Sequence, residues 1–247
     1  MIPFVSLLRL GLKDRVSLGW AVAFPILLFA GLALAFGETT YRAQMLPGVV
    51  VMAGVFFTLH GTAFEVLNGR RSGVYKLLRA TPYRVGRFVA MLALTRGLLA
   101  LGCALIVLLA CALLFGVPLT PKGAVLLPLP LTLGLLCFTL FGFVVGNVGN
   151  SEGEVAAYNN LGTFPVLLTK GAFFNLEHAP GWVQTLSGLL PFRYFFRAVQ
   201  MALMGDAAAL LRPLLVLAGF TLLALLLAVG TFRWDAGAPA RLHLRRV

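Results

Sequence analysis

Five long stretches of this chain contain no Lys, Arg, Asp or Glu. They cover residues 16–36, 45–64, 97–117, 123–146 and 213–232. A helix needs about 20 apolar residues to cross the hydrocarbon core of a bilayer, and each stretch is at least that long. Because a helix satisfies its own backbone hydrogen bonds, each stretch predicts a transmembrane helix.

A sixth stretch, residues 155–176, is apolar but is interrupted by Asn159, Asn160 and Lys170. The whole chain is 60% hydrophobic and only 11% charged, whereas soluble domains carry about 25% charged residues. We therefore expect an all-α integral membrane protein with six transmembrane helices. Residues 177–212, which lie between the sixth stretch and the last span, are too charged to cross.

The basic residues are distributed unevenly along this topology. With six spans, one side of the membrane holds three Lys and Arg before the first span, seven between the second and third, and four after the last. The other side holds six. Since Lys and Arg collect on the cytoplasmic side, both termini are expected there. The net charge of +12 is then explained by topology and lipid headgroups, and nucleic acid is not an expected partner.

Motifs of catalysis are missing from the sequence. It has no GxxxxGK[ST] phosphate loop, no HExxH and no GxSxG. The three histidines share no helical face, the eight acids are scattered, and the three cysteines lie in apolar runs. We expect no catalytic, cofactor-binding or metal site in this chain, and an intramembrane enzyme is disfavoured.

The segment "RRSGVYKLLRATPYR", residues 70–84, is basic and amphipathic. Val74, Leu77 and Leu78 follow the i, i+3, i+4 spacing of a short helix, and Pro82 disfavours helix at the preceding residue. Glu65, one turn before this segment, is a candidate ion-pair partner of its first two arginines. Two interpretations stay open: a helix that lies on lipid headgroups, or a helix that docks on a cytoplasmic protein.

Two longer stretches resemble a known family. "FEVLNGRRSGVYKLLRATPYRVGRFVAML", residues 64–92, and "TKGAFFNLEHAPGWVQTLSGLLPFRYFFRAVQMAL", residues 169–203, are similar to the cytoplasmic loop and the outer segment of type-2 ATP-binding-cassette transporter permeases. The start "FVSLLRLGLKDR" is similar to that family's interface helix. Lys170 and Asn175 depart from the family pattern, which usually has a small residue and often has proline at these positions.

The resemblance implies one permease domain over residues 1–247. Its expected parts are an amphipathic interface helix (1–15), a cytoplasmic coupling loop with its helix (68–87), outward re-entrant helices (177–212) and a cytoplasmic tail (233–247). The implied function is the membrane subunit of an exporter in the cytoplasmic membrane of a prokaryote. Its implied partners are two ATPase subunits, which carry ATP and Mg, and a second permease copy that is identical or closely related.

Three groups of functional residues are predicted, two with the help of the resemblance and one, the pathway group, from polar residues within apolar stretches. The ATPase-coupling group is Glu65, Arg70, Arg71, Tyr75, Leu77, Leu78, Arg79, Thr81 and Pro82. The pathway group is His60, Asn159, Asn160 and Lys170. For His60 the favoured interpretation is a packed, hydrogen-bonded neutral histidine, and for Lys170 it is a side chain that snorkels to the interface. The outer-gate group is Phe173, Phe174, Pro180, Trp182, Pro191, Tyr194 and Arg197.

The alternative function is a secondary transporter or channel. Such a protein needs charged or broken helices near the membrane midplane and usually an internal repeat. The sequence shows neither clearly, although Pro25 and Pro165 can break helices. The cargo, whether drug, lipid-linked glycan, peptide or ion, stays open.

Overall fold

The computed structural model describes residues 4–35, 39–73, 75, 85–167 and 188–232, and all regular elements within these ranges are helices. They are α1 (Phe4–Lys13), α2 (Arg15–Ala35), α3 (Thr39–Val55), the π-helix η1 (Phe56–His60), α4 (Gly61–Arg71), α6 (Val85–Phe115), α7 (Pro121–Leu126), α8 (Pro128–Val148), α9 (Glu152–Leu167), α11 (Pro191–Met204) and α12 (Ala207–Gly230). This confirms the all-α membrane fold.

Five helical segments in the described part are long and apolar enough to cross a membrane: Arg15–Ala35, Tyr41–Arg71, Val85–Phe115, Pro121–Val148 and Ala207–Gly230. They match the five strong predicted spans. The predicted sixth span begins as α9, which has 16 residues and ends at Leu167. Its remaining residues lie outside the described ranges, so the count of six stays a prediction.

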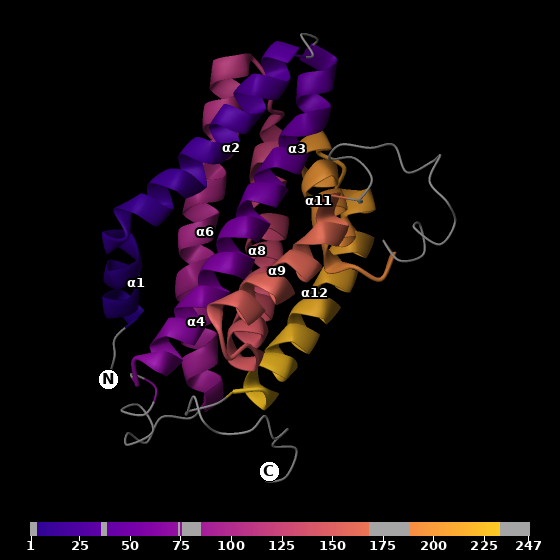
Figure 1. Cartoon of the computed structure of the whole chain (residues 1–247). Coiled ribbons are helices and arrows are strands. Elements are labelled where there is room, and N and C mark those ends of the chain that lie inside the picture. Colours follow the sequence, from indigo (N-terminus) through magenta and orange to yellow (C-terminus); the bar gives the residue numbers. More distant parts are fainter. Residues whose placement is uncertain (1–3, 36–38, 74, 76–84, 168–187, 233–247) are drawn as a thin grey trace.

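The long helices form a bundle around α8, which packs against α12, α4 and α6. Helix α1 and the last turn of α12 lie at one end, which we call the base, and the end of α2 and the start of α3 lie at the other end, which we call the top (Figure 1). Helix α1 covers much of the predicted interface segment 1–15. Its position at a membrane surface stays a prediction.

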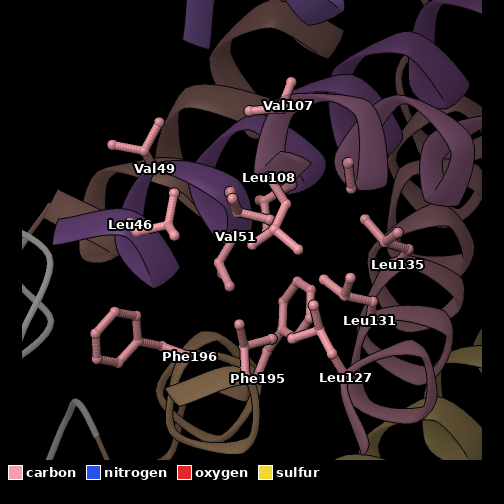
Figure 2. Close-up of a cluster of buried hydrophobic side chains, with 14 of the residues drawn as sticks. Leu46, Val49, Val51, Val107, Leu108, Leu127, Leu131, Leu135, Phe195 and Phe196 are labelled. Atoms are coloured by element: carbon pink, nitrogen blue, oxygen red, sulfur yellow. The ribbon is translucent and has the colours of Figure 1, made fainter. Parts of the chain in front are cut away.

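The larger hydrophobic core joins α3, α6, α8 and α11. Figure 2 shows its side chains gathered between these helices, among them Leu46, Val107, Leu131 and Phe195. A second buried cluster at the base joins Val66, Tyr75, Phe88, Phe143 and Phe232. The bundle is therefore packed separately at its two ends.

Two glycines on α8 bring it into direct backbone contact with its neighbour. A Cβ atom on Gly142 would meet the carbonyl oxygen of Leu59 in η1, and one on Gly146 would meet the carbonyl oxygen of Ala63 in α4. The Gly-x-x-x-Gly spacing therefore has the close-packing role that it has in other membrane helices.

Three predicted boundaries need correction. Helix α4 runs to Arg71 and α6 starts at Val85, so both helices extend into the segment 68–87 that was predicted as a loop. The 31 residues from Tyr41 to Arg71 span about 45 Å, which exceeds the hydrocarbon core of about 30 Å. These helices continue past the membrane because their polar residues find partners at the base.

The other two boundaries are set by helix caps. The last helix begins at Ala207, not at residue 213, because Gly205 adopts a positive φ of 75° and the carboxylate of Asp206 accepts a hydrogen bond of 3.0 Å from the Ala209 N–H. The last residues of the predicted outer segment 177–212 therefore belong to α12. The helix of the predicted sixth stretch, residues 155–176, begins earlier than predicted, with Glu152 and Glu154 in the first turn of α9.

Candidate coupling site at the base of the bundle

Arg70, in the last turn of α4, is buried and reaches across to the end of α8. Its guanidinium donates hydrogen bonds to the backbone carbonyls of Asn147 and Gly149. The last carbonyls of a helix have no partner within the helix and carry partial negative charge. A buried cation is therefore stabilised at this position, and α4 is tied to the end of α8.

Arg71, the next residue, contacts the turn between α8 and α9. Its Nη1 lies 3.2 Å from the Glu152 Oε1, and its Nη2 donates a hydrogen bond of 3.1 Å to the carbonyl oxygen of Asn150. We call the contacts of Arg70 and Arg71 with residues 147–152 the arginine clasp. The clasp joins the end of α4 to the turn from which α9 starts.

The same turn is braced from within by two hydrogen bonds that resemble a capping box, with the Asn150 N–H in place of the Ser151 N–H. The Glu154 N–H donates a hydrogen bond of 3.1 Å to the Ser151 hydroxyl, and the Asn150 N–H donates one of 2.9 Å to the Glu154 carboxylate. Such reciprocal bonds satisfy the free N–H groups at a helix start. The pattern Ser-x-x-Glu is present in "NSEGEV" and was the sequence signal that could have placed the start of α9.

Glu65 of α4 forms an ion pair with Arg96 of α6. Both side chains are partly buried, and an ionisable group at such a depth normally has a charged partner. The sequence had suggested the arginines that follow Glu65 along the chain, because they are close in sequence. The partner that the structure shows is 31 residues further along, on the next long helix.

The structure describes Tyr75 but not residues 74 and 76–84 beside it. The ring of Tyr75 is buried at the base. The ring meets Phe88 edge to face at a centroid distance of 5.4 Å and lies 6.0 Å from the ring of Phe232. A Cβ on Gly69 would lie 2.9 Å from the Tyr75 ring, so the absence of a side chain at Gly69 lets the ring pack against α4. Burial raises the pKa of Tyr75 and Glu65 raises it further, which keeps the phenol neutral.

The remaining coupling residues, Leu77, Leu78, Arg79, Thr81 and Pro82, lie outside the described residues. The structure does show the two flanks of this segment. Tyr75 precedes it and Phe88 follows it, and the two rings are in contact. The two described residues that flank this segment are therefore packed on each other at the base.

A groove of about 940 Å³ opens beside the site, between α2, the η1–α4 segment and α6. Its polar lining includes Asp14, His60, Glu65 and Arg96, and its apolar lining is largely aromatic. The His60 ring stacks on Phe56 at 5.0 Å at the end of η1. Single π-helical turns within helices are frequent at functional sites.

The predicted pathway residues are only partly brought together. The Asn160 side chain of α9 lies close enough to interact with the His60 imidazole. Asn159 is buried, and its side-chain amide has no hydrogen bond to any described residue. Lys170 lies outside the described residues, and a role of these groups in cargo passage stays a prediction.

The described outer-gate residues lie on α11. Pro191 is its first residue, the Tyr194 hydroxyl donates a hydrogen bond of 2.9 Å to the carbonyl of Gly188, and Arg197 is exposed. Phe173, Phe174, Pro180 and Trp182 lie outside the described residues. The gate itself therefore stays a prediction.

Comparison with known proteins adds one positive finding. The family model described as ABC-2 type transporter matches residues 7–204, which is about four fifths of the chain and runs from α1 to the end of α11. The comparison with curated proteins found no match.

Proposed function

Because the chain belongs to the ABC-2 type transporter family, we propose that it is the membrane-spanning subunit of an exporter that is driven by a separate ATPase. Family membership makes it a permease component of an ABC transporter. The sequence contains no phosphate-binding loop of its own. In our proposal ATP and Mg therefore bind to two ATPase subunits, and this chain pairs with a second permease copy.

The observation that carries the proposal is the way the base is joined together. Glu65 and Arg96 link α4 to α6, the arginine clasp links α4 to α8 and α9, and Tyr75 packs on α6 and against Phe232. Packed helices of this kind move as rigid bodies and do not bend. A force on residues 76–84 then moves several helices together, as a permease that receives mechanical work needs.

The proposal fixes an orientation. The base faces the cytoplasm, both termini lie there, and the top faces the outside of the cytoplasmic membrane of a prokaryote. Closure of the ATPases on ATP pushes the coupling segment, and the bundle alternates between inward-facing and outward-facing states. Cargo leaves at the top.

The test is recovery of the ATPase with the permease. The chain carries an affinity tag, is extracted from its native membranes in mild detergent, and the bound proteins are identified. Wild-type protein is expected to retain an ATPase with a phosphate-binding loop. The variant Leu77→Ala/Leu78→Ala/Arg79→Glu is expected to insert normally but to lose that ATPase, because it removes packed methyl groups and reverses a charge.

The control variant is Lys122→Glu, which makes the same charge reversal on an exposed residue at the start of α7. It should retain the ATPase. Recovery of the ATPase with the triple variant at the wild-type level would contradict docking through this segment and would favour a helix that rests on lipid.

A further inference from the structure

The groove between α2, the η1–α4 segment and α6 is lined by one face of each helix. The face of α2 runs from Ser17 to Phe24. That of the η1–α4 segment runs from Phe57 to Ser72, and α6 contributes Arg96. Within each face the lining residues recur every three or four positions, which is the spacing of one side of a helix. The volume of about 940 Å³ lies in the range of sites for organic ligands, about 300–1,000 Å³.

Three charged side chains of the groove act on one another. Glu65 forms an ion pair with Arg96, and the charge of Arg96 also acts on the Asp14 carboxylate. Hydrogen bonds from Ser17, one of them 3.1 Å from its N–H to the Asp14 Oδ1, hold the pKa of Asp14 below its usual 3.8. Asp14 is therefore ionised at neutral pH, and one guanidinium is shared by two carboxylates.

Aromatic side chains make up much of the groove walls. Trp20 and Phe24, one helical turn apart on α2, are 64% and 55% exposed, and Phe57 and Phe64 belong to the η1–α4 wall. The face of an aromatic ring attracts a cation, and sites for quaternary ammonium ligands are commonly built from such rings. The groove thus combines an ionised, exposed carboxylate with accessible ring surfaces.

The charge of the ligand follows from these groups. The guanidinium among the described lining residues, that of Arg96, is already paired with Glu65, so an anion would meet two carboxylates and a cation that is already paired. A neutral apolar molecule would remove water from the Asp14 carboxylate without replacing it, which is unfavourable. A ligand that is apolar and carries a positive charge satisfies both the carboxylate and the rings.

We propose that the groove binds a hydrophobic organic cation, with its charge beside the Asp14 carboxylate and its apolar groups against Trp20 and Phe24. That this ligand is the exported cargo rests on the proposed function. The groove borders the Glu65–Arg96 pair, which links α4 to α6. A bound ligand therefore contacts both of the helices that flank the coupling segment.

The test compares two ions of the same shape and opposite charge, tetraphenylphosphonium and tetraphenylborate. Binding of each to the full chain, purified in a neutral maltoside detergent, is measured by equilibrium dialysis, and uptake by protein-free micelles is subtracted. Because the Asp14 carboxylate attracts one ion and repels the other, wild-type protein is expected to bind the phosphonium at least about tenfold more tightly. The measurement needs no ATPase, so its failure would leave the exporter proposal intact, and failure of ATPase recovery would leave the binding site intact.

Asp14→Asn removes the charge and keeps the cap at the start of α2, because asparagine is an equally good cap. It should weaken phosphonium binding about fivefold and reduce the preference over the borate. Asp206→Asn is the matched control. The Asp206 carboxylate caps α12 through an equivalent hydrogen bond of 3.0 Å from the Ala209 N–H and lies outside the groove, so this variant should leave both affinities unchanged.

Phe24→Ala tests the aromatic wall. Loss of the ring should weaken phosphonium binding about tenfold, because it removes both apolar contact and the attraction of the ring for the cation. Leu34→Ala truncates another exposed side chain of α2 that does not line the groove, and it should have no effect.

Three results would overturn the proposal. The first is an absence of phosphonium binding to wild-type protein, which would indicate that another part of the chain or a second copy fills the groove. The second is equal wild-type affinity for the two ions, as expected of a site that takes any apolar chain. The third is equal phosphonium affinity of wild-type protein and the folded Asp14→Asn variant.

Discussion

Adjacent arginines in the clasp should differ sharply in their contribution to stability. Arg70 is 1% exposed, whereas the side chains of Arg71 and its partner Glu152 are 43% and 69% exposed. Replacing either arginine by methionine removes the charge and keeps a side chain of similar length. Arg70→Met and Arg71→Met therefore form a matched pair at neighbouring positions of one helix.

The expected magnitudes follow from the contacts. Arg70 donates to two carbonyls, and a hydrogen bond from a charged group contributes about 1.5–3 kcal/mol. Its loss should cost about 3–6 kcal/mol, and two carbonyls lose their partner. The exposed pair of Arg71 contributes about 0–1 kcal/mol. For a chain of this size, 1 kcal/mol corresponds to a melting-point change of about 2–4 °C.

The assay is thermal melting of the purified chain in detergent, followed by the fraction that stays monodisperse in size-exclusion chromatography. Arg70→Met should melt at least about 6 °C below wild type and Arg71→Met within about 4 °C of it. Arg70→Lys should lie between, because one ammonium cannot reach both carbonyls in the geometry of a guanidinium. Equal melting points for the two methionine variants would refute the view that Arg70 holds α4 to α8.

Three other substitutions test separate parts of the account. Gly146→Leu should abolish the monodisperse chain, because α4 backbone occupies the space, while Gly102→Leu, whose Cβ meets no atom within 4 Å, should leave it intact. Tyr75→Ala should destabilise the base by about 3–5 kcal/mol and reduce ATPase recovery in the pull-down, whereas Tyr75→Phe should behave as wild type in both. The Ser17 hydrogen bonds hold the pKa of Asp14 below its usual 3.8; its stabilisation should be complete at neutral pH and disappear as the pH falls through that lowered value. The melting difference between wild type and Asp14→Ala should shrink over that range, and a constant difference would exclude the charge of Asp14 as its cause.

Five spans were predictable from the sequence because hydrophobic length is a local property. The ends of α4 and α6 were not, since the polar residues there are accommodated by contacts between helices. Glu65 and Arg96 each looked like an end of an apolar run. Their ion pair lets both helices continue, and no window of neighbouring residues contains that information.

The candidate site was predictable only in part, because most of its contacts join residues that are far apart in the sequence. Arg70 and Arg71 stood out by their charge, but two of their partners are the carbonyls of Asn147 and Gly149. A backbone carbonyl is present at every residue and leaves no signal in a sequence. Helix caps do leave a signal in the sequence. Asp206 before an alanine run indicated the start of α12 and would have placed Arg212 inside a helix.

The central claim is that ATP on a partner moves the base of this chain as one body. The most direct test is the distance between spin labels in the complex reconstituted in nanodiscs, with and without trapped nucleotide. The three native cysteines are replaced, and labels are placed at the exposed positions Ser72 and Gly153, on the two sides of the clasp. The account predicts that the distance between Ser72 and Gly153 within one chain stays constant, while the distance between the Ser72 labels of two permease copies changes by several ångströms. A constant distance between copies with nucleotide trapped, or a change confined to one chain, would contradict it.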